Sequence, residues 1–415
     1  MNGTDGAPGP VLVAFSGGLD TSWCVARERA GAGRRVVTAT VDTGGFDAAE
    51  LAAIERRSAQ LGAERHVTVD GRAAVFDRFV RHLVAGNCLR GQTYPLCVAA
   101  ERIVQAEEIA RLARELGAAC VVHGSTGAGN DQIRFDVAFA VLLPGVPVHA
   151  PVRELAPTRD EEYAYLEELG VVLPREQKRY SVNRGLWGTT IGGGDLHRPE
   201  RPLPTDCWPD TVAPDAAPAA GDTVAVTFRA GVPVALDGVE HGGPELVAAL
   251  NARGAAQGVG RGVHTGDTIL GIKGRLAFEA PAAAVLLFAH RELEKLVLTS
   301  RQQTWKDQLG AYYASLVHEA LWFDPVARDV EAFLASTQRQ VTGTVRVRLV
   351  RGRLEVAGVE TRTSLMGRLG AVYGEGSRGW TGEEARGFAK IYGLPSVLAA
   401  LRDHEAAQAR KGGDA

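Results

Sequence analysis

The chain has 415 residues, of which 45% are hydrophobic and 23% charged, and its formal net charge is −3. These values are typical of a soluble globular protein with two or three domains, and they argue against a disordered or fibrous chain. Lys+Arg (46) and Asp+Glu (49) nearly balance, so we expect neither a broad basic surface nor duplex nucleic acid as the main partner.

The cysteines and histidines form no pattern typical of disulfides or metal sites. The five cysteines are scattered, and neither CxxC nor HExxH occurs. The N-terminus lacks the features of a signal peptide, and no apolar run approaches the ~20 residues of a membrane span. We therefore expect a cytoplasmic protein that holds no metal through its own side chains.

The first part of the chain alternates short apolar runs with helical patterns. After a flexible tail over residues 1–9, strands are predicted at 11–15, 35–41, 65–69 and 118–123, and helices at 20–32, 48–61, 76–83 and 99–116. This alternation predicts an α/β nucleotide-binding domain over 10–171, with a parallel sheet flanked by helices. Three of the predicted strands are followed by glycine-rich stretches, at the sheet edge where such folds bind ligands.

The second part, residues 172–380, is predicted to be an α+β domain for substrate binding and subunit contacts. Residues 172–194 look like a glycine-rich loop. The predicted elements are hairpins at 223–236 and 343–356, a short strand at 270–272, and helices at 244–253, 281–298 and 307–322. A C-terminal helix and tail occupy 381–415, with a capping box expected at Thr381.

A glycine turn between the first strand and the first helix is the strongest local signal. It consists of Ala14, Phe15, Ser16, Gly17, Gly18, Leu19, Asp20, Thr21 and Ser22. Free N–H groups at a helix N-terminus bind anions, and the hydroxyls add donors. The spacing and the Lys of a Walker A loop are missing. Taken without context, Ser-Gly-Gly could equally be an ordinary capped turn.

These residues resemble the PP-loop of the ATP pyrophosphatase superfamily, and more closely the AYSGGLDTS loop of the argininosuccinate synthase family. The resemblance continues in the same order over about residues 10–400. It is carried by 93–96, 123–135, 158–162, 180–190, 258–261, 271–275, 321–325, 341–343 and 392–395.

The resemblance implies a PP-loop fold and an ATP-dependent ligase that adenylates a ureido or amide oxygen and displaces AMP with an amine, aspartate's. It also implies Mg²⁺ bound through ATP, and a homotetramer. Residues 14–22, Val41 and Gly124 would bind ATP, and Ser16, Asp20 and Asp131 would act in catalysis. The aspartate positions are Thr126, Asn130, Asp131 and Val98, and the acceptor positions are Tyr94, Asn130, Arg134, Ser181, Thr190, Gly266 and Phe278. Taken singly, Tyr94 could be a core residue and the hydroxyls helix caps.

Several substrate-side positions depart from the family pattern. Val98 stands where Thr is usual, Ala128 where Lys is usual, Gly266 where an acceptor-binding Glu is usual, and Phe278 where Tyr is usual. Because a site that hydrogen-bonds one ligand discriminates against others, these changes favour a modified acceptor in a specialised pathway. The alternatives are a housekeeping argininosuccinate synthase acting on citrulline, a PP-loop enzyme that modifies nucleotides or tRNA, and a non-catalytic ligand sensor.

Overall fold

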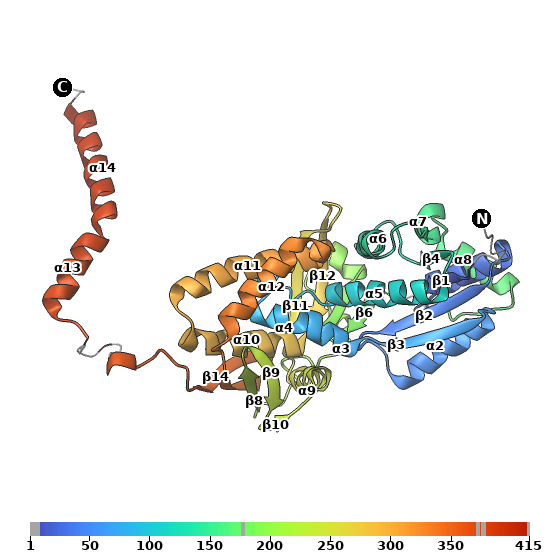
Figure 1. Ribbon diagram of the computed structural model, residues 1–415, viewed down its shortest axis with the longest axis horizontal. Helices are drawn as coiled ribbons and strands as arrows, with labels where there is room; N and C mark the ends of the chain where they lie inside the picture. The colour runs from blue at the N-terminus through green and yellow to red at the C-terminus, as the bar shows by residue number, and fades with distance from the viewer. Residues whose placement is uncertain (1–8, 176–178, 371–373, 375–378, 413–415) are drawn as a thin grey trace, which may run out of the picture. The chain divides into compact units, whose positions relative to one another are not determined.

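The structure, a computed structural model, describes residues 9–175, 179–370, 374 and 379–412 (Figure 1). The chain divides into two compact units, Met1–Thr363 and Ser364–Ala415. No helix in the described ranges is both long enough and apolar enough to cross a membrane.

The first half of the larger unit is built on a five-stranded sheet, in the order β3–β2–β1–β4–β5, in which every neighbouring pair is parallel. The strands are β1 (Val11–Ala14), β2 (Val36–Asp42), β3 (Arg65–Asp70), β4 (Cys120–His123) and β5 (Val148–His149). The direction of strand addition reverses at β1, which lies between β2 and β4. The carboxyl ends of β1 and β4 therefore form the switch point where open α/β sheets bind ligands.

Helices cover both faces of this sheet because its strands are apolar on both sides. In β1, Val11 and Val13 pack into one core with α1, α2, α7 and α8, whereas Leu12 packs into another with α5 and α6. These helices are α1 (Leu19–Ala26, continued by a π-turn at Arg27–Gly31), α2 (Ala48–Gln60), α5 (Ala99–Leu116), α6 (Asp131–Leu142), α7 (Pro151–Leu155) and α8 (Arg159–Glu168). The predicted parallel α/β domain is confirmed.

Two antiparallel sheets form the second half of this unit, as predicted for an α+β region. One has the order β10–β9–β8–β13–β14 and the other β11–β12–β7–β6. The strands are β6 (Ser181–Gly185), β7 (Gly188–Gly192), β8 (Asp222–Arg229), β9 (Val232–Leu236), β10 (Val239–Glu240), β11 (Arg261–Asp267), β12 (Lys273–Glu279), β13 (Gly343–Val350) and β14 (Arg353–Glu360).

The helices of the second half share one large core with the segment that follows β3. That segment is continuous through α3 (Arg72–Val75), a π-turn (Phe76–Val80) and α4 (Arg81–Ala85). The others are α9 (Gly243–Ala256), α10 (Pro281–Val297), α11 (Ser300–His318) and α12 (Pro325–Gln338), with 3₁₀ turns at Gly194–His197, Thr205–Cys207 and Leu321–Phe323. The common core joins the two halves into one unit.

Several sequence-based predictions in this half were wrong. Residues 181–192, expected to be a loop, form the β6–β7 hairpin, and 261–279 form the β11–β12 hairpin, whose turn includes the strand predicted at 270–272. Both hairpins contain many glycines and hydroxyl residues, which weakens the apolar alternation that signals a strand. The helix predicted at 307–322 is α11, which ends at His318, before Ala320 takes a φ of 62°.

The smaller unit contains a 3₁₀ turn (Arg368–Gly370), α13 (Gly382–Tyr392) and α14 (Leu394–Gly412). The capping box predicted at Thr381 is confirmed: its side chain accepts from the Glu384 N–H, and the Glu384 side chain accepts from the Thr381 N–H.

Candidate functional site

The glycine turn that follows β1 lies at the switch point of the sheet, at the N-terminus of α1. Phe15 is buried, and its carbonyl accepts a 2.6 Å hydrogen bond from the Thr40 hydroxyl of β2. Gly17 has a φ of 71°, which favours glycine, and Gly18 in an extended conformation precedes the helix. The N–H groups at a helix start such as this one suit a polyphosphate.

The hydroxyl groups of this turn differ in accessibility. Ser16 is exposed, and its Oγ lies 3.2 Å from that of the half-buried Thr21. Ser22, predicted as a further phosphate ligand, is fully buried, and its hydroxyl has no partner among the described residues. The structure therefore presents Ser16 and Thr21 to a ligand more openly than Ser22.

Asp20, at the start of α1, forms an acidic pair with Glu162 of α8. Burial raises the pKa of Asp20, opposed by the positive charge of Arg159. Burial, together with the charge of Asp20, raises the pKa of Glu162 on α8 to about 7. In the described part of the chain, no three His, Cys, Asp or Glu residues are grouped so that they could hold a metal ion.

Gly124, at the end of β4, lies directly against the first turn of α1. A Cβ at this position would lie 2.9 Å from Thr21 Cγ2 and 3.2 Å from the Thr21 backbone N. Only glycine allows this close approach, which brings two of the predicted ATP-binding segments together. Val41 is buried near the end of β2, the neighbouring strand on the other side of β1.

The loop after Gly124 leads into α6, where Asp131 is held between two arginines. Its carboxylate accepts from Arg102 Nε (2.8 Å) and from Arg134 Nη1 (2.9 Å). Burial alone would raise the pKa of Asp131, but the two guanidinium groups lower it to about 2. The side chain is therefore charged throughout the physiological pH range and is a weak proton acceptor.

Arg134 is buried and linked to the end of α11. Its Nε donates to the His318 carbonyl (3.0 Å), and its Nη2 donates to His318 Nδ1 (3.3 Å). These bonds and the one to Asp131 use three of its five N–H groups, which leaves two for a ligand. Thr126 is exposed, whereas the Asn130 Oδ1 accepts a 2.9 Å hydrogen bond from the Ile269 N–H in the β11–β12 turn.

The other predicted acceptor positions come from the segment at Tyr94 and from the β6–β7 and β11–β12 hairpins. Tyr94 is buried; its hydroxyl donates to the Cys97 carbonyl (2.5 Å), and its ring lies 5.4 Å from that of Phe278. Phe278 and Thr190 are paired residues of β12 and β7. Ser181 is exposed at the far end of the β6–β7 hairpin.

Two of the altered positions have unusual surroundings. A Cβ on Gly266 would lie 2.7 Å from His264 Nε2, so the imidazole occupies the space of a side chain at 266. Val98 is buried with a φ of 71°, a strained conformation for a β-branched residue.

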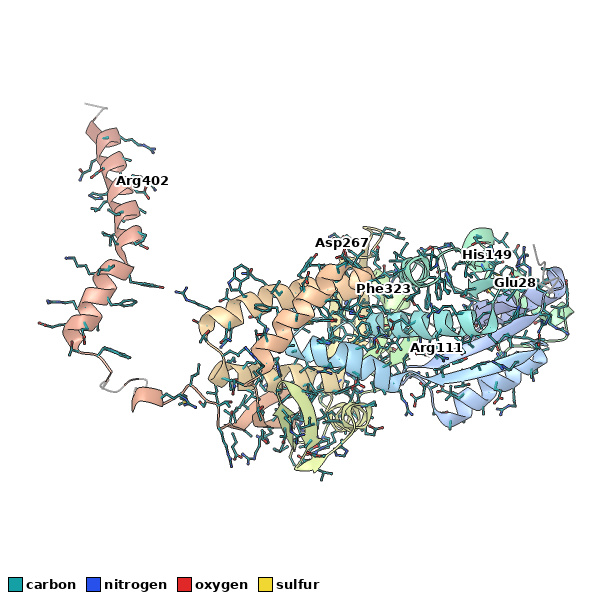
Figure 2. The ribbon with its side chains drawn as sticks, in the orientation of Figure 1. Glu28, Arg111, His149, Asp267, Phe323 and Arg402 are labelled. Atoms are coloured by element: carbon teal, nitrogen blue, oxygen red, sulfur yellow. The ribbon has the colours of Figure 1, made fainter. Side chains whose placement is uncertain are left out.

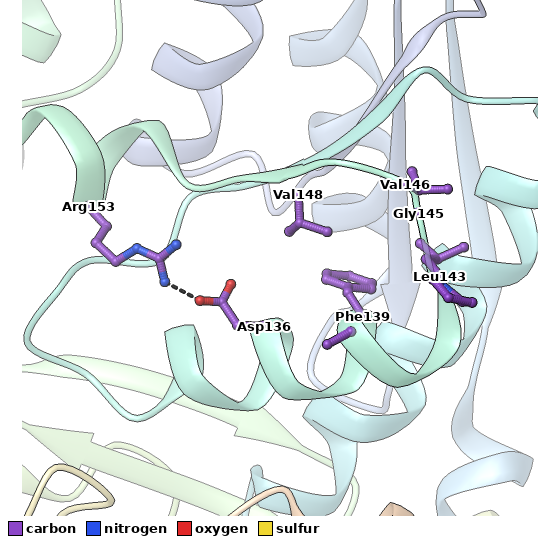
Figure 3. Close-up of a pocket in the computed structure, with 9 residues that line it drawn as sticks. Asp136, Phe139, Leu143, Gly145, Val146, Val148 and Arg153 are labelled. Atoms are coloured by element: carbon purple, nitrogen blue, oxygen red, sulfur yellow. Dashed lines mark hydrogen bonds and ion pairs between the residues drawn. The ribbon is translucent and has the colours of Figure 1, made fainter.

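The pocket in Figure 3, with a volume of about 310 Å³, is separate from the predicted substrate residues. It is lined by α6, β5 and the segment between them, and Arg153 and Asp136 form an ion pair at its edge. None of the predicted substrate residues lines it.

Sequence reasoning missed Arg102, His264 and His318. Arg102 lies on a helix whose pattern indicated only packing, and each histidine lies three residues outside a recognised motif, His264 after 258–261 and His318 before 321–325. A further signal was the position of His264, two residues before Gly266 and so on the same side of the strand.

Family models and relatives match nearly the whole chain. The Arginosuccinate synthase N-terminal HUP domain matches residues 10–172, and the Arginosuccinate synthase C-terminal domain matches residues 180–399. The argininosuccinate synthase of Xanthomonas campestris pv. campestris is 42% identical over 403 residues, which cover 94% of this chain and 97% of that protein.

More distant argininosuccinate synthases match over a similar length. That of Pyrobaculum aerophilum is 37% identical, and that of Methanocaldococcus jannaschii is 35% identical; each match covers 94% of this chain and 98% of the relative. Among solved structures, an NH3-dependent NAD synthetase from Campylobacter jejuni is 16% identical with a TM-score of 0.28, over 40% of this chain and 66% of that chain.

Proposed function

Because the chain belongs to the argininosuccinate synthase family of ATP-dependent ligases, which form a C–N bond and release AMP and pyrophosphate, we propose that it joins L-aspartate to citrulline. The ureido oxygen of citrulline attacks the α-phosphate of MgATP, which forms an adenylate and releases pyrophosphate. The aspartate amine then attacks the ureido carbon, loses a proton and displaces AMP. Mg²⁺ enters with the nucleotide as part of the substrate.

The observation that carries this proposal is that a single loop, residues 124–131, connects the nucleotide turn with the charged cluster around Asp131. Its first residue contacts Thr21, and its last is bonded to Arg102 and Arg134. This arrangement supports placing the α-phosphate and the attacking amine at opposite ends of one short segment, so that positioning supplies much of the catalysis.

Within this proposal the residues have distinct roles. N–H groups at the start of α1, with Ser16 and Thr21, hold the phosphates. Asp131 orients the aspartate ammonium by charge, because a carboxylate with a pKa of about 2 accepts a proton poorly at neutral pH. The two remaining N–H groups of Arg134 face the acceptor carboxylate.

A second candidate keeps the chemistry and changes the acceptor. It is favoured by Gly266, which stands where the family usually has an acceptor-binding Glu, and by the His264 imidazole, whose Nε2 would lie 2.7 Å from a Cβ at that position. The names of the relatives favour citrulline, so the modified acceptor expected from the sequence becomes the alternative.

The test combines purified protein with ATP, Mg²⁺, aspartate and citrulline, and measures pyrophosphate and argininosuccinate. We expect both products in equal amounts. Pyrophosphate release that requires a different ureido or amide compound, with none from citrulline, would select the second candidate. Assembly as a homotetramer and location in the cytoplasm stay predictions.

A further inference from the structure

Two imidazole nitrogens beside the acceptor-side residues are buried without a hydrogen-bond partner among the described residues. They are the Nε2 atoms of His264 and His318. Tyr94 contacts both rings, with centroid distances of 5.6 Å to His264 and 6.4 Å to His318. Buried polar atoms are nearly always paired in folded proteins, so two unpaired nitrogens in one cluster indicate a missing partner.

The hydrogen bond at His318 Nδ1 determines which nitrogen carries the proton. Its partner there is Arg134 Nη2, 3.3 Å away, and a guanidinium group only donates. Nδ1 is therefore the acceptor, and the neutral ring carries its proton on Nε2. Burial and the charges of Arg134 and Arg90 lower the pKa of His318 to about 2, which keeps the ring neutral. His318 Nε2–H is thus a buried donor without an acceptor.

The outer part of the β11–β12 ribbon, which carries His264, has no strand partner beyond the hairpin itself. β11 pairs with β12 along its whole length, but β12 pairs with β7 only over Ala277–Glu279, so the outer part of the hairpin projects from the sheet. Asp267, labelled in Figure 2, lies near its end. Hydrogen bonds tie this outer part to three other segments: Arg90 Nη2 donates to the Asp267 carbonyl (2.8 Å), the Ile269 N–H donates to Asn130 Oδ1 (2.9 Å), and Arg275 Nη1 donates to the Arg198 carbonyl (2.9 Å).

We propose that His318 is a specificity-determining residue that binds the acceptor. When the β11–β12 ribbon lifts, His318 Nε2–H donates a hydrogen bond to a carboxylate oxygen of the acceptor, beside the free N–H groups of Arg134. A carboxylate is the class of ligand that fits, because a neutral N–H donor and a guanidinium group together suit an anionic oxygen pair. This inference rests on the proposed ligase function and deepens it.

Two variants of His318 test the roles of its two ring nitrogens separately. His318→Asn keeps an oxygen near the Nδ1 position as an acceptor for Arg134, but it removes the Nε2–H donor. His318→Gln has a longer side chain, whose amide N–H can take the place of Nε2–H. We expect His318→Asn to raise the KM for citrulline about tenfold, with the KM values for ATP and aspartate nearly unchanged. His318→Gln should recover most of the loss. With citrulline amide, which lacks the carboxylate, wild type and His318→Asn should have the same KM.

A measurement on the wild-type protein tests the inference even if the variants fold poorly. In ¹⁵N-histidine NMR, His318 should be the Nε2–H tautomer, and citrulline should shift that signal. An unchanged signal, an unchanged citrulline KM in His318→Asn, or an equal rise in all three KM values would overturn the inference while the proposed function stands.

If wild type makes no argininosuccinate, the proposed function fails. The variants are then compared on whichever ureido or amide acid supports ATP- and aspartate-dependent pyrophosphate release. The same selective rise in its KM would support the role of His318. If no such acid supports release, both the inference and the proposed function are overturned.

Discussion

Gly124 shows how a residue without a side chain shapes the nucleotide site. It ends β4, the strand on one side of the switch point, and meets the backbone of Thr21 at the start of α1. A methyl group here would meet backbone as well as side chain, so neighbouring rotamers cannot relieve the contact. Gly127, three residues along the same loop, has its nearest atom at 3.7 Å, which is ordinary contact.

We therefore expect Gly124→Ala to push the loop away from the start of α1 and to raise the KM for ATP at least about tenfold, since a displacement of about 1 Å can cost a hundredfold in rate. Gly127→Ala is the matched control and should behave like wild type. Steady-state kinetics with varied ATP, at saturating aspartate and citrulline, measure the effect. Equal KM values for the two variants would contradict this account of the loop.

At the scale of elements, α5 is linked to the β6–β7 hairpin through a buried carboxyl group. Glu101 is fully buried, and its Oε1 accepts from the Trp187 N–H (3.1 Å) in the turn of that hairpin. Burial raises the pKa of Glu101 to about 7, despite these N–H donors and the charges of Arg102 and Arg134. The ordinary value is 4.5. Burial therefore favours a protonated, neutral carboxyl group at this link.

This raised pKa predicts how stability depends on pH. The folded state binds the proton of Glu101 more tightly than the unfolded state, so the free energy of unfolding should decrease as pH rises from about 4.5 to about 7. Glu101→Gln stays neutral. Between pH 5 and pH 8 we expect wild type to lose about 2 kcal/mol more stability than this variant.

Urea unfolding at the two pH values measures this difference. Glu115→Gln, an exposed substitution on the same helix, is the control and should follow wild type. If Glu101→Gln lost as much stability between pH 5 and pH 8 as wild type, Glu101 would have an ordinary pKa in the folded protein.

At the scale of the whole molecule, the unit Ser364–Ala415 has an exposed apolar surface. On α13, Phe388, Ile391 and Tyr392 are all exposed, and no residue of this helix is buried. They lie on one side of the helix, because residues three and four apart share a face. An apolar face of this kind is typical of a surface for another protein chain, which fits the predicted homotetramer.

We expect Ile391→Glu to reduce the assembly to a smaller species, because it places a charge in that apolar face. Arg386→Glu, on the opposite side of the same helix, is the control and should leave assembly intact. Light scattering after size-exclusion chromatography measures the mass. If both variants kept the mass of wild type, α13 would play no part in assembly.

The amino-acid sequence was enough to predict the parallel α/β domain, its nucleotide turn and the family. Each depends on local order along the chain: buried strands read as short apolar runs, and glycines at strand ends mark the turn after β1 and the close approach at Gly124. The hairpins at 181–192 and 261–279 were missed because glycine and hydroxyl residues obscure the alternation on which strand prediction depends.

The surroundings of the substrate-side residues depend on long-range packing and could not be predicted from the sequence. Packing brought Arg102 from α5 to Asp131 and His318 from α11 to Arg134, and it placed the His264 imidazole close to the position of a Cβ at 266. No sequence pattern specifies such contacts, because they join residues up to 184 positions apart through the packing of separate elements. Local order specified the strands and the turn, whereas burial and long-range packing set the charge of Asp131 and left an unpaired donor on His318.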